Sequence, residues 1–301
     1  MCNNIIEKQY KTEEEFLANY DANKYEKPSV TVDMLIFTIN KTKSENYRAL
    51  SNKSLQILMV KRKDYPYKDK WAIPGGFAKI DENIKDSALR ELKEETNLDN
   101  VYMEQLYTWG DVGRDPRTRV VSVSYMALAN KEELDVKAGD DAAEANWFDV
   151  SYTLDNVTNE DGIEKKDYIL QLKNDEVTLQ ATIRENKTIN HNIIDIKYEI
   201  INNGDIAFDH AKIIAYALYR LKTKVEWSDI AFHLMPDEFT IGDLQDTYSL
   251  ILGKELIAPN FRRKMKPMLI DIGKESEDIA GHRPAKLFKF NPNWKEEGGI
   301  F

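Results

Sequence analysis

The 301-residue chain has a single cysteine, Cys2, and no long apolar run. One thiol cannot form a disulfide within the chain and cannot hold a zinc ion with a second thiol, so we expect core packing to supply the stability. No apolar run approaches the ~18 residues that a membrane-spanning helix needs, and the first residues lack the basic-then-apolar order of a signal peptide. We therefore expect a cytoplasmic protein with no membrane partner.

The chain also lacks an excess of positive charge. Its 42 Lys and Arg residues face 52 Asp and Glu residues, which gives a net charge of -10. This balance excludes a uniformly basic coat for nucleic acid, so any contact with DNA has to come from a local patch. Hydrophobic residues make up 42% of the chain, and at ~150 residues per domain its length allows about two domains with packed cores.

The pattern of apolar residues divides the chain into three parts. Residues 1–150 predict an α+β domain, with helices at about 12–20 and 86–98 and strands at about 29–39, 55–61, 71–77, 101–109, 119–128 and 145–150. Residues 151–204 contain three runs with a period of two, which predict a small β-rich insertion or linker of about three strands. Residues 205–301 are helical at first and then strand-like.

The third part has the pattern of a winged helix-turn-helix domain. Three helical segments begin near Phe208, at the capping-box pair Thr240 and Asp243, and near Pro259, which suits a first helical turn. Two strand-like segments around a polar loop close the chain. Three helices followed by a β-hairpin describe a winged helix.

An acidic helix is the most informative segment. Glu91, Glu94 and Glu95 are spaced i, i+3 and i+4, which places three mutually repelling carboxylates on one face. Oxygen ligands of this kind suit Mg²⁺, which retains waters for a phosphate substrate. Arg90 can bridge Glu82 or a neighbouring acid and hold the cluster in place. The alternative is a solvated acidic face balanced by nearby lysines.

The spacing around this helix resembles the Nudix box of hydrolases that act on nucleoside diphosphate linkages. Gly76 is followed after five residues by Glu82 and after seven more by the run from Arg90 to Glu95. Asn97 departs from the pattern by standing where the family usually has glycine, although asparagine tolerates the left-handed conformation at a helix end. The resemblance implies a Nudix fold, which is an α/β/α sandwich, and attack of water on a pyrophosphate aided by Mg²⁺ or Mn²⁺. It also implies metal ligands at Gly76, Glu91, Glu94 and Glu95 and catalytic roles for Glu82, Arg90, Glu91, Glu94 and Glu95.

A basic loop downstream is a candidate substrate site. Arg114, Arg117 and Arg119 lie within six residues, a density suited to forked recognition of phosphate. The alternative is a loop whose arginines pair with nearby aspartates. The stretch resembles ADP-ribose pyrophosphatases and their regulator relatives, which implies ADP-ribose or a similar nucleoside diphosphate sugar. Tyr67 and Trp71 are candidates to stack on a base, with a core position as the alternative.

A second basic cluster lies in the winged helix. Arg262, Arg263, Lys264 and Lys266 place four positive charges in five residues, where they can meet the phosphate backbone of double-stranded DNA. Asn260 or Arg263 can reach base edges, and Arg283 in the wing can add a contact. The alternative is a solvated helix that pairs with acids of the first domain.

Together these segments resemble the Nudix-related transcriptional regulators, a resemblance that covers most of the chain outside residues 151–204. It implies a homodimer that responds to ADP-ribose or another metabolite. Two functions stay open: an Mg²⁺-dependent Nudix pyrophosphohydrolase that also binds DNA, or a metabolite-responsive regulator with weak or no hydrolysis.

Overall fold

The computed structural model describes residues 11–42, 52–97, 101–134, 142–276 and 284–295. Its largest element is a 10-stranded sheet with the order β10-β9-β8-β7-β2-β1-β6-β5, in which β3 pairs with β2 and β4 with β1. β1 and β6 are parallel, and the other pairs are antiparallel. The strands are β1 (Ser29–Thr42), β2 (Asn52–Arg62), β3 (Trp71–Ala72), β4 (Gly75–Phe77), β5 (Tyr102–Trp109), β6 (Val120–Leu128), β7 (Ala142–Glu160), β8 (Ile163–Lys173), β9 (Thr178–Asn190) and β10 (Ile193–Asn202).

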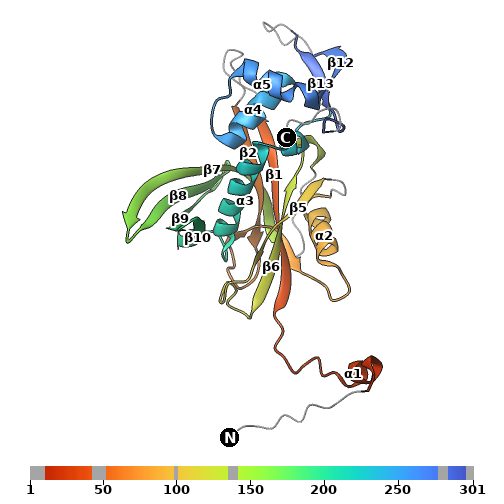
Figure 1. Ribbon diagram of the computed structural model, residues 1–301, viewed down its shortest axis with the longest axis vertical. Coiled ribbons are helices and arrows are strands. Elements are labelled where there is room, and N and C mark those ends of the chain that lie inside the picture. Colours follow the sequence, from red (N-terminus) through yellow and green to blue (C-terminus); the bar gives the residue numbers. More distant parts are fainter. Residues whose placement is uncertain (1–10, 43–51, 98–100, 135–141, 277–283, 296–301) are drawn as a thin grey trace.

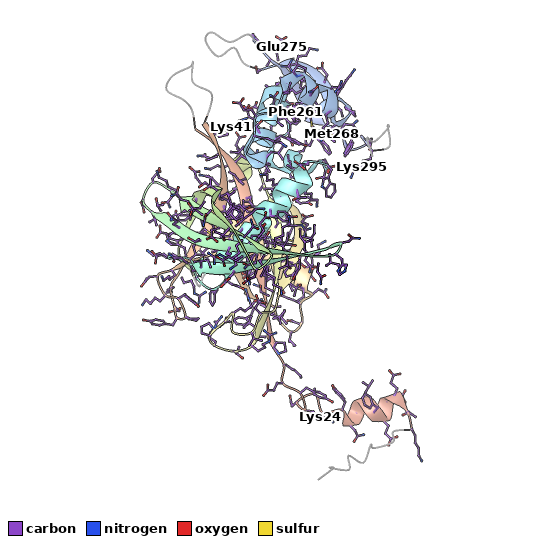
Figure 2. The ribbon with its side chains drawn as sticks, turned by 60° about the vertical axis from the view of Figure 1, so that its left-hand side comes forward. Lys24, Lys41, Phe261, Met268, Glu275 and Lys295 are labelled. Atoms are coloured by element: carbon purple, nitrogen blue, oxygen red, sulfur yellow. The ribbon has the colours of Figure 1, made fainter. Side chains whose placement is uncertain are left out.

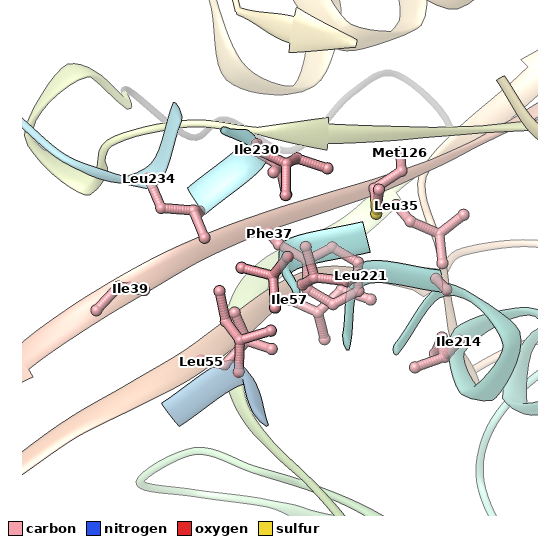
Figure 3. Packing of buried hydrophobic residues seen from close by; sticks show 14 of the residues in the cluster. Leu35, Phe37, Ile39, Leu55, Ile57, Met126, Ile214, Leu221, Ile230 and Leu234 are labelled. Carbon is pink, nitrogen blue, oxygen red and sulfur yellow. The ribbon is translucent and has the colours of Figure 1, made fainter. Parts of the chain in front are cut away.

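Helices cover both faces of the sheet, as the α/β/α prediction requires. Alternate residues of a strand point to opposite faces, and in β1 Met34 and Ile36 pack with residues of α2 (Ile84–Thr96). Leu35 and Phe37 point the other way and belong to the larger core, which includes α3 (His210–Val225). Figure 3 shows this larger core from close by. The apolar run of β1 is therefore buried on both sides.

Residues 151–204 extend the same sheet. The three predicted strands are present as β8, β9 and β10, and the long strand β7 joins them to the rest of the sheet (Figure 1). β7 pairs with β2 along its first half and with β8 along its second half, so the predicted boundary at residue 150 lies inside one strand. The period of two identified the strands, but it holds no information about which partner each strand takes.

The winged helix is built from short elements above the sheet (Figure 2). They are η2 (Ile230–Leu234), β11 (Phe239–Thr240), α4 (Ile241–Leu252), α5 (Ala258–Met265), η3 (Lys266–Met268), β12 (Leu269–Glu275) and β13 (Lys286–Phe290). The hydroxyl of Thr240 accepts a hydrogen bond from the Asp243 N–H, and Pro259 lies in the first turn of α5, both as predicted. The helix predicted from Phe208 as the first helix of the winged helix is α3, and it packs on the sheet instead. The helix that directly precedes β11 is η2. A helix of five residues is too short for periodicity to reveal.

A buried lysine joins the sheet to the winged helix. The ammonium of Lys53, in β2, lies 3.1 Å from the Asp243 carboxylate and 3.2 Å from that of Asp246, both in α4. At the other end, α1 (Glu13–Asn19) buries no residue and stands apart from the sheet (Figure 1). The remaining short helix is η1 (Lys131–Glu133). Among the described residues, no helix has the length and apolar character to cross a membrane.

Candidate functional site

A glycine turn brings the backbone against the acidic helix. Gly76 lies in β4, and a Cβ atom on it would be 2.3 Å from Oε1 of Glu91 in α2. A Cβ on Gly75 would be equally close to the carbonyl oxygen of Val32. Only glycine permits these approaches, so the backbone of Gly76 and the Glu91 carboxylate are neighbours.

The side chains of the three glutamates among the predicted metal ligands do not point in one direction. Glu91 and Glu95, one turn apart, are 7% and 8% exposed, whereas the side chain of Glu94 is 54% exposed. Within the described residues no group of three or more His, Cys, Asp and Glu is positioned to hold a metal ion. The turn at Gly76 and the buried carboxylates of Glu91 and Glu95 suit a divalent cation that prefers oxygen ligands, and Glu94 would have to reorient to join them.

Arg90 gathers the acids of the box. Its guanidinium donates to Glu82 Oε1 at 3.0 Å and to Glu91 Oε1 at 2.7 Å, and it lies 3.4 Å from Glu94 Oε2. The predicted bridge from Arg90 to Glu82 is therefore confirmed. The hydrogen bond from Arg90 lowers the pKa of Glu82 to about 2. Burial raises the pKa of Glu91, against the opposing effect of Arg90.

A cavity of about 260 Å³ opens beside this helix. Its lining includes Gly76, Glu95, Arg114 and Arg117, which come from β4, α2 and the loop before β6. A glycine turn, a carboxylate and two guanidinium groups thus meet around one space. This combination can bind an anion together with a cation.

Carboxylates hold the two arginines of the cavity. Arg114 is 2.8 Å from Asp209, the residue before α3, and 3.5 Å from Asp33 in β1. Arg117 is 2.7 Å from Asp115, which is the loop pairing considered as the alternative. Arg119 donates to the carbonyl of Asp111 at 2.9 Å and does not line the cavity.

The predicted aromatic residues lie elsewhere. Trp71 is 3% exposed and packs edge-on against Phe148, with the ring centroids 4.8 Å apart, so its ring belongs to the core and has no free face for a base. Tyr67 packs on Phe208 with the centroids 4.6 Å apart and does not line the cavity. Tyr65, Phe77 and Phe208 line it instead. Phe77 directly follows the glycine of the box, which was the available signal.

Two buried polar residues of the cavity were missed. The Nδ1 atom of His210 accepts a hydrogen bond from the Ile73 N–H at 3.0 Å, and Asp33 accepts one from the Ser122 hydroxyl at 2.5 Å. Asp33 interrupts the apolar stretch from Val32 to Phe37 in β1, which is a signal that sequence reasoning could have used. His210 carries no comparable signal, because it reaches the cavity from α3, far along the chain.

The predicted cationic cluster lies on the surface of the winged helix. Phe261 and Met265 anchor α5 in the core, and the basic residues Arg262, Arg263, Lys264 and Lys266 are exposed. Arg263 lies 3.5 Å from Asn260, and Lys264 donates to the carbonyl of Glu226 at 2.6 Å. In the described part of the chain none of the four cations forms a salt bridge, which disfavours the alternative of pairing with the first domain. Arg283 lies outside the described residues.

A sheet between two helices with a Nudix box, joined to a winged helix, defines a class of DNA-binding Nudix proteins. Residues 48–167 match the NUDIX domain model, and residues 231–290 match the NrtR DNA-binding winged helix domain. The ADPR responsive transcriptional repressor NtrR of Acinetobacter baylyi is 31% identical over 93% of this chain and 89% of its own length. The chain therefore belongs to the NrtR family of Nudix-related regulators.

Three further proteins are similar to all or part of this chain. The ADP-ribose pyrophosphatase of Methanocaldococcus jannaschii is 34% identical over 49% of this chain and 78% of its own length. A MutT/nudix family protein from Enterococcus faecalis has a TM-score of 0.66 at 27% identity, with 93% of this chain and 94% of that chain covered. Shewanella oneidensis NrtR complexed with a 27mer DNA has a TM-score of 0.57 at 25% identity, with 89% and 95% covered.

Proposed function

We propose that this chain is a transcriptional regulator that binds DNA through its winged helix and ADP-ribose through its Nudix cavity. The observation that carries the proposal is a continuous connection between the two sites. Asp209 holds Arg114 of the cavity, and α3 begins at the next residue and runs to Val225, below the winged helix. The similarity of this chain, over 93% of its length, to a repressor described as ADPR responsive supports the same proposal.

In the cavity, Arg117 is the residue best placed to bind the diphosphate. Its side chain is 42% exposed, whereas that of Arg114 is 6% exposed and is enclosed by Asp33 and Asp209. The diphosphate would compete with Asp115 for the guanidinium fork of Arg117. Arg114 would instead position the loop. The adjacent ring of Phe77 lies under Arg117, with the guanidinium carbon 5.4 Å from the ring centroid, and limits its movement.

In the winged helix, the exposed cations of α5 would meet the phosphates of double-stranded DNA. Neutralising phosphates releases bound counterions, so the affinity would fall as the salt concentration rises. Asn260 and Arg263 stand on the same helix and would reach base edges in the major groove. As in other helix-turn-helix regulators, a homodimer would read two half-sites.

Hydrolysis of the bound diphosphate is a second proposed activity, supported by the geometry at Gly76. The carbonyl of Gly76 and the carboxylates of Glu91 and Glu95 would hold Mg²⁺ or Mn²⁺, and Arg90 would keep Glu82 and Glu91 in place. When bound, such an ion neutralises charge on the diphosphate and lowers the pKa of a bound water. Glu94 would take part after leaving Arg90.

Calorimetry with ADP-ribose tests the binding proposal. Arg117→Gln should weaken binding about tenfold, because one charged hydrogen-bonding fork is lost. The control Lys197→Gln removes the same charge from an exposed position on β10. Equal affinities of Arg117→Gln and the unchanged protein would contradict the assignment.

Release of phosphate monoesters from ADP-ribose tests hydrolysis separately. We expect activity that needs Mg²⁺ and is lost with EDTA. Glu95→Gln should lower the rate about a hundredfold, as expected for removal of a metal ligand. A rate that is independent of both changes would exclude the proposed metal site, and no release of product at all would leave ADP-ribose binding as the only role of the cavity.

A further inference from the structure

A diagonal row of polar and aromatic side chains crosses the outer half of the sheet. Tyr168 in β8 is opposite Ile183 in β9, and Glu185 lies two residues beyond Ile183 on the same face. Glu185 is directly opposite Tyr198 in β10. Tyr152 in β7 is opposite Leu170, which shares the face of Tyr168. One side chain from each of four strands therefore stands on the face towards α3.

These side chains border a cavity of about 360 Å³ that shares no lining residue with the Nudix cavity. The rings of Tyr152 and Tyr168 are stacked with their centroids 4.7 Å apart, and the Tyr198 hydroxyl lies 3.3 Å from Glu185. Tyr219 of α3 contributes a fourth tyrosine, and the end of α4 closes another side. This volume falls in the range of small-molecule sites.

Within the described residues, two polar groups of this cavity lack a partner that such groups usually have in a protein. The Tyr152 hydroxyl is buried and has no hydrogen-bond partner among the described residues. Glu185 is the single carboxylate of the lining, and in the described chain it forms no ion pair. Lys166, opposite it in register, is bound to Glu164 at 2.7 Å instead. Lys222, the single cation of the lining, is exposed at the end of α3.

Aromatic faces with one carboxylate form an environment for a particular kind of ligand. The faces of tyrosine rings carry negative potential and attract cations, most strongly where water is excluded. A metal ion would need several oxygen ligands and would not gain from an apolar floor, which here includes Leu55, Leu221 and Ile251. An organic cation can use the rings, the carboxylate and the apolar floor together.

We propose that this cavity is a second ligand site, which binds a small organic cation of the pyridinium or methylated-ammonium class. Glu185 supplies the counter-charge, and the rings of Tyr168 and Tyr198 pack against the cation. The lining comes from the outer strands and from α3, and Leu252 and Gly253 bring the end of α4 to the site. A ligand there would contact the sheet and the winged helix at once.

Ligand-observed NMR with the full chain tests this site. The probes are N-methylpyridinium and toluene, which have the same shape but differ in charge. N-methylpyridinium should bind more tightly than toluene. Glu185→Gln should weaken its binding about tenfold, because Glu185 is the only carboxylate among the described residues that line the cavity. Glu199→Gln removes the same charge from the other face of β10, is exposed, and should leave binding unchanged.

Two further variants make the result decisive. Tyr168→Leu should also weaken binding of the cation, and Lys222→Gln should strengthen it, because a competing positive charge is removed from the rim. Equal binding of N-methylpyridinium and toluene would assign the cavity to neutral aromatic compounds and would overturn the proposal. Binding of neither probe, or an equal effect of Glu185→Gln and Glu199→Gln, would overturn it as well.

Discussion

The two basic regions of this protein hold their charges in opposite ways. In the Nudix cavity, Arg114 and Arg117 are each fixed by carboxylates, whereas the cations of α5 form no ion pair within the described structure. Fixed charges lose little freedom when a ligand binds, and they favour one ligand shape. Solvated charges favour affinity that depends on salt rather than on shape. The first region is thus suited to one small anion and the second to a long polyanion.

The largest expected effect concerns the shape of the cavity. Gly76→Ala would place a Cβ atom 2.3 Å from Glu91 Oε1, so β4 or the carboxylate has to move. We expect ADP-ribose binding to weaken about a hundredfold, because a displacement of about 1 Å within a site can have an effect of this size. Calorimetry measures this change, with Gly242→Ala as the control, because its Cβ would make an ordinary contact at 3.6 Å. Unchanged binding by Gly76→Ala would show that the fixed geometry is not needed.

The second largest expected effect concerns the contact between the sheet and the winged helix at Lys53. Lys53→Met removes a buried cation from two carboxylates of α4, and we expect the free energy of unfolding to fall by about 2 kcal/mol. Lys41→Met is the control, because Lys41 is half-exposed and lies 3.4 Å from the same Asp243; its effect should stay below ~0.5 kcal/mol. Urea denaturation measures both. Equal losses would mean that burial of Lys53 adds nothing to this contact.

On the α5 face, Arg263→Gln should weaken DNA binding by about tenfold at moderate salt. Fluorescence anisotropy with DNA from upstream of the gene, measured over a salt series, gives both the affinity and its salt dependence. Arg262→Gln, which would remove a phosphate contact, should lower the slope of log affinity against log salt by about one, whereas Arg263→Gln, which would remove a base contact, should relax the sequence preference. Lys197→Gln, far from α5, should change neither quantity. An affinity that is independent of salt would contradict a role for the solvated cations.

The smallest expected effect is a pH dependence of stability that arises from His210 in the lining of the Nudix cavity. Burial lowers the pKa of His210 below its ordinary value of 6.5, although the nearby carboxylates of Asp33 and Asp209 act in the opposite direction. Below pH 6.5 the unfolded chain therefore binds a proton that the folded chain excludes. Stability should fall as the pH drops through this value, by at most ~1.4 kcal/mol per pH unit. Urea denaturation above and below pH 6.5 measures it.

His210→Asn is the variant for this measurement. It removes the titrating group and leaves an acceptor near the position of Nδ1 for the Ile73 N–H. The drop in stability below pH 6.5 should therefore shrink in this variant. An equally steep drop would assign the pH dependence to other groups.

The local features of the fold could be predicted from the sequence, because they depend on neighbours in the chain. The spacing of the Nudix box predicted α2, the bridge from Arg90 to Glu82, and the helix end at Asn97, which adopts the left-handed conformation with φ of 58°. The Thr240 cap and the first turn of α5 were predicted in the same way. Each of these depends on residues fewer than ten positions apart.

Features that depend on distant partners could not be predicted. Asp209 binds Arg114 across 95 positions, and no periodicity encodes that pairing. The direction of the Glu94 side chain follows from Arg90, although helical spacing alone places it with Glu91 and Glu95. Trp71 occupies the core position that was considered as the alternative, but its partner Phe148, from another strand of the sheet, could not be predicted. Tertiary packing decided each of these positions.

We propose that ADP-ribose in the Nudix cavity changes the affinity of the winged helix for DNA, and a DNA titration in the presence of ADP-ribose tests this claim most directly. The affinity for DNA should change when ADP-ribose is added to the unchanged protein, and Arg117→Gln should need about tenfold more ADP-ribose for the same change. If calorimetry detects bound ADP-ribose while the DNA affinity stays the same at every concentration, the two sites are independent and the claim is wrong.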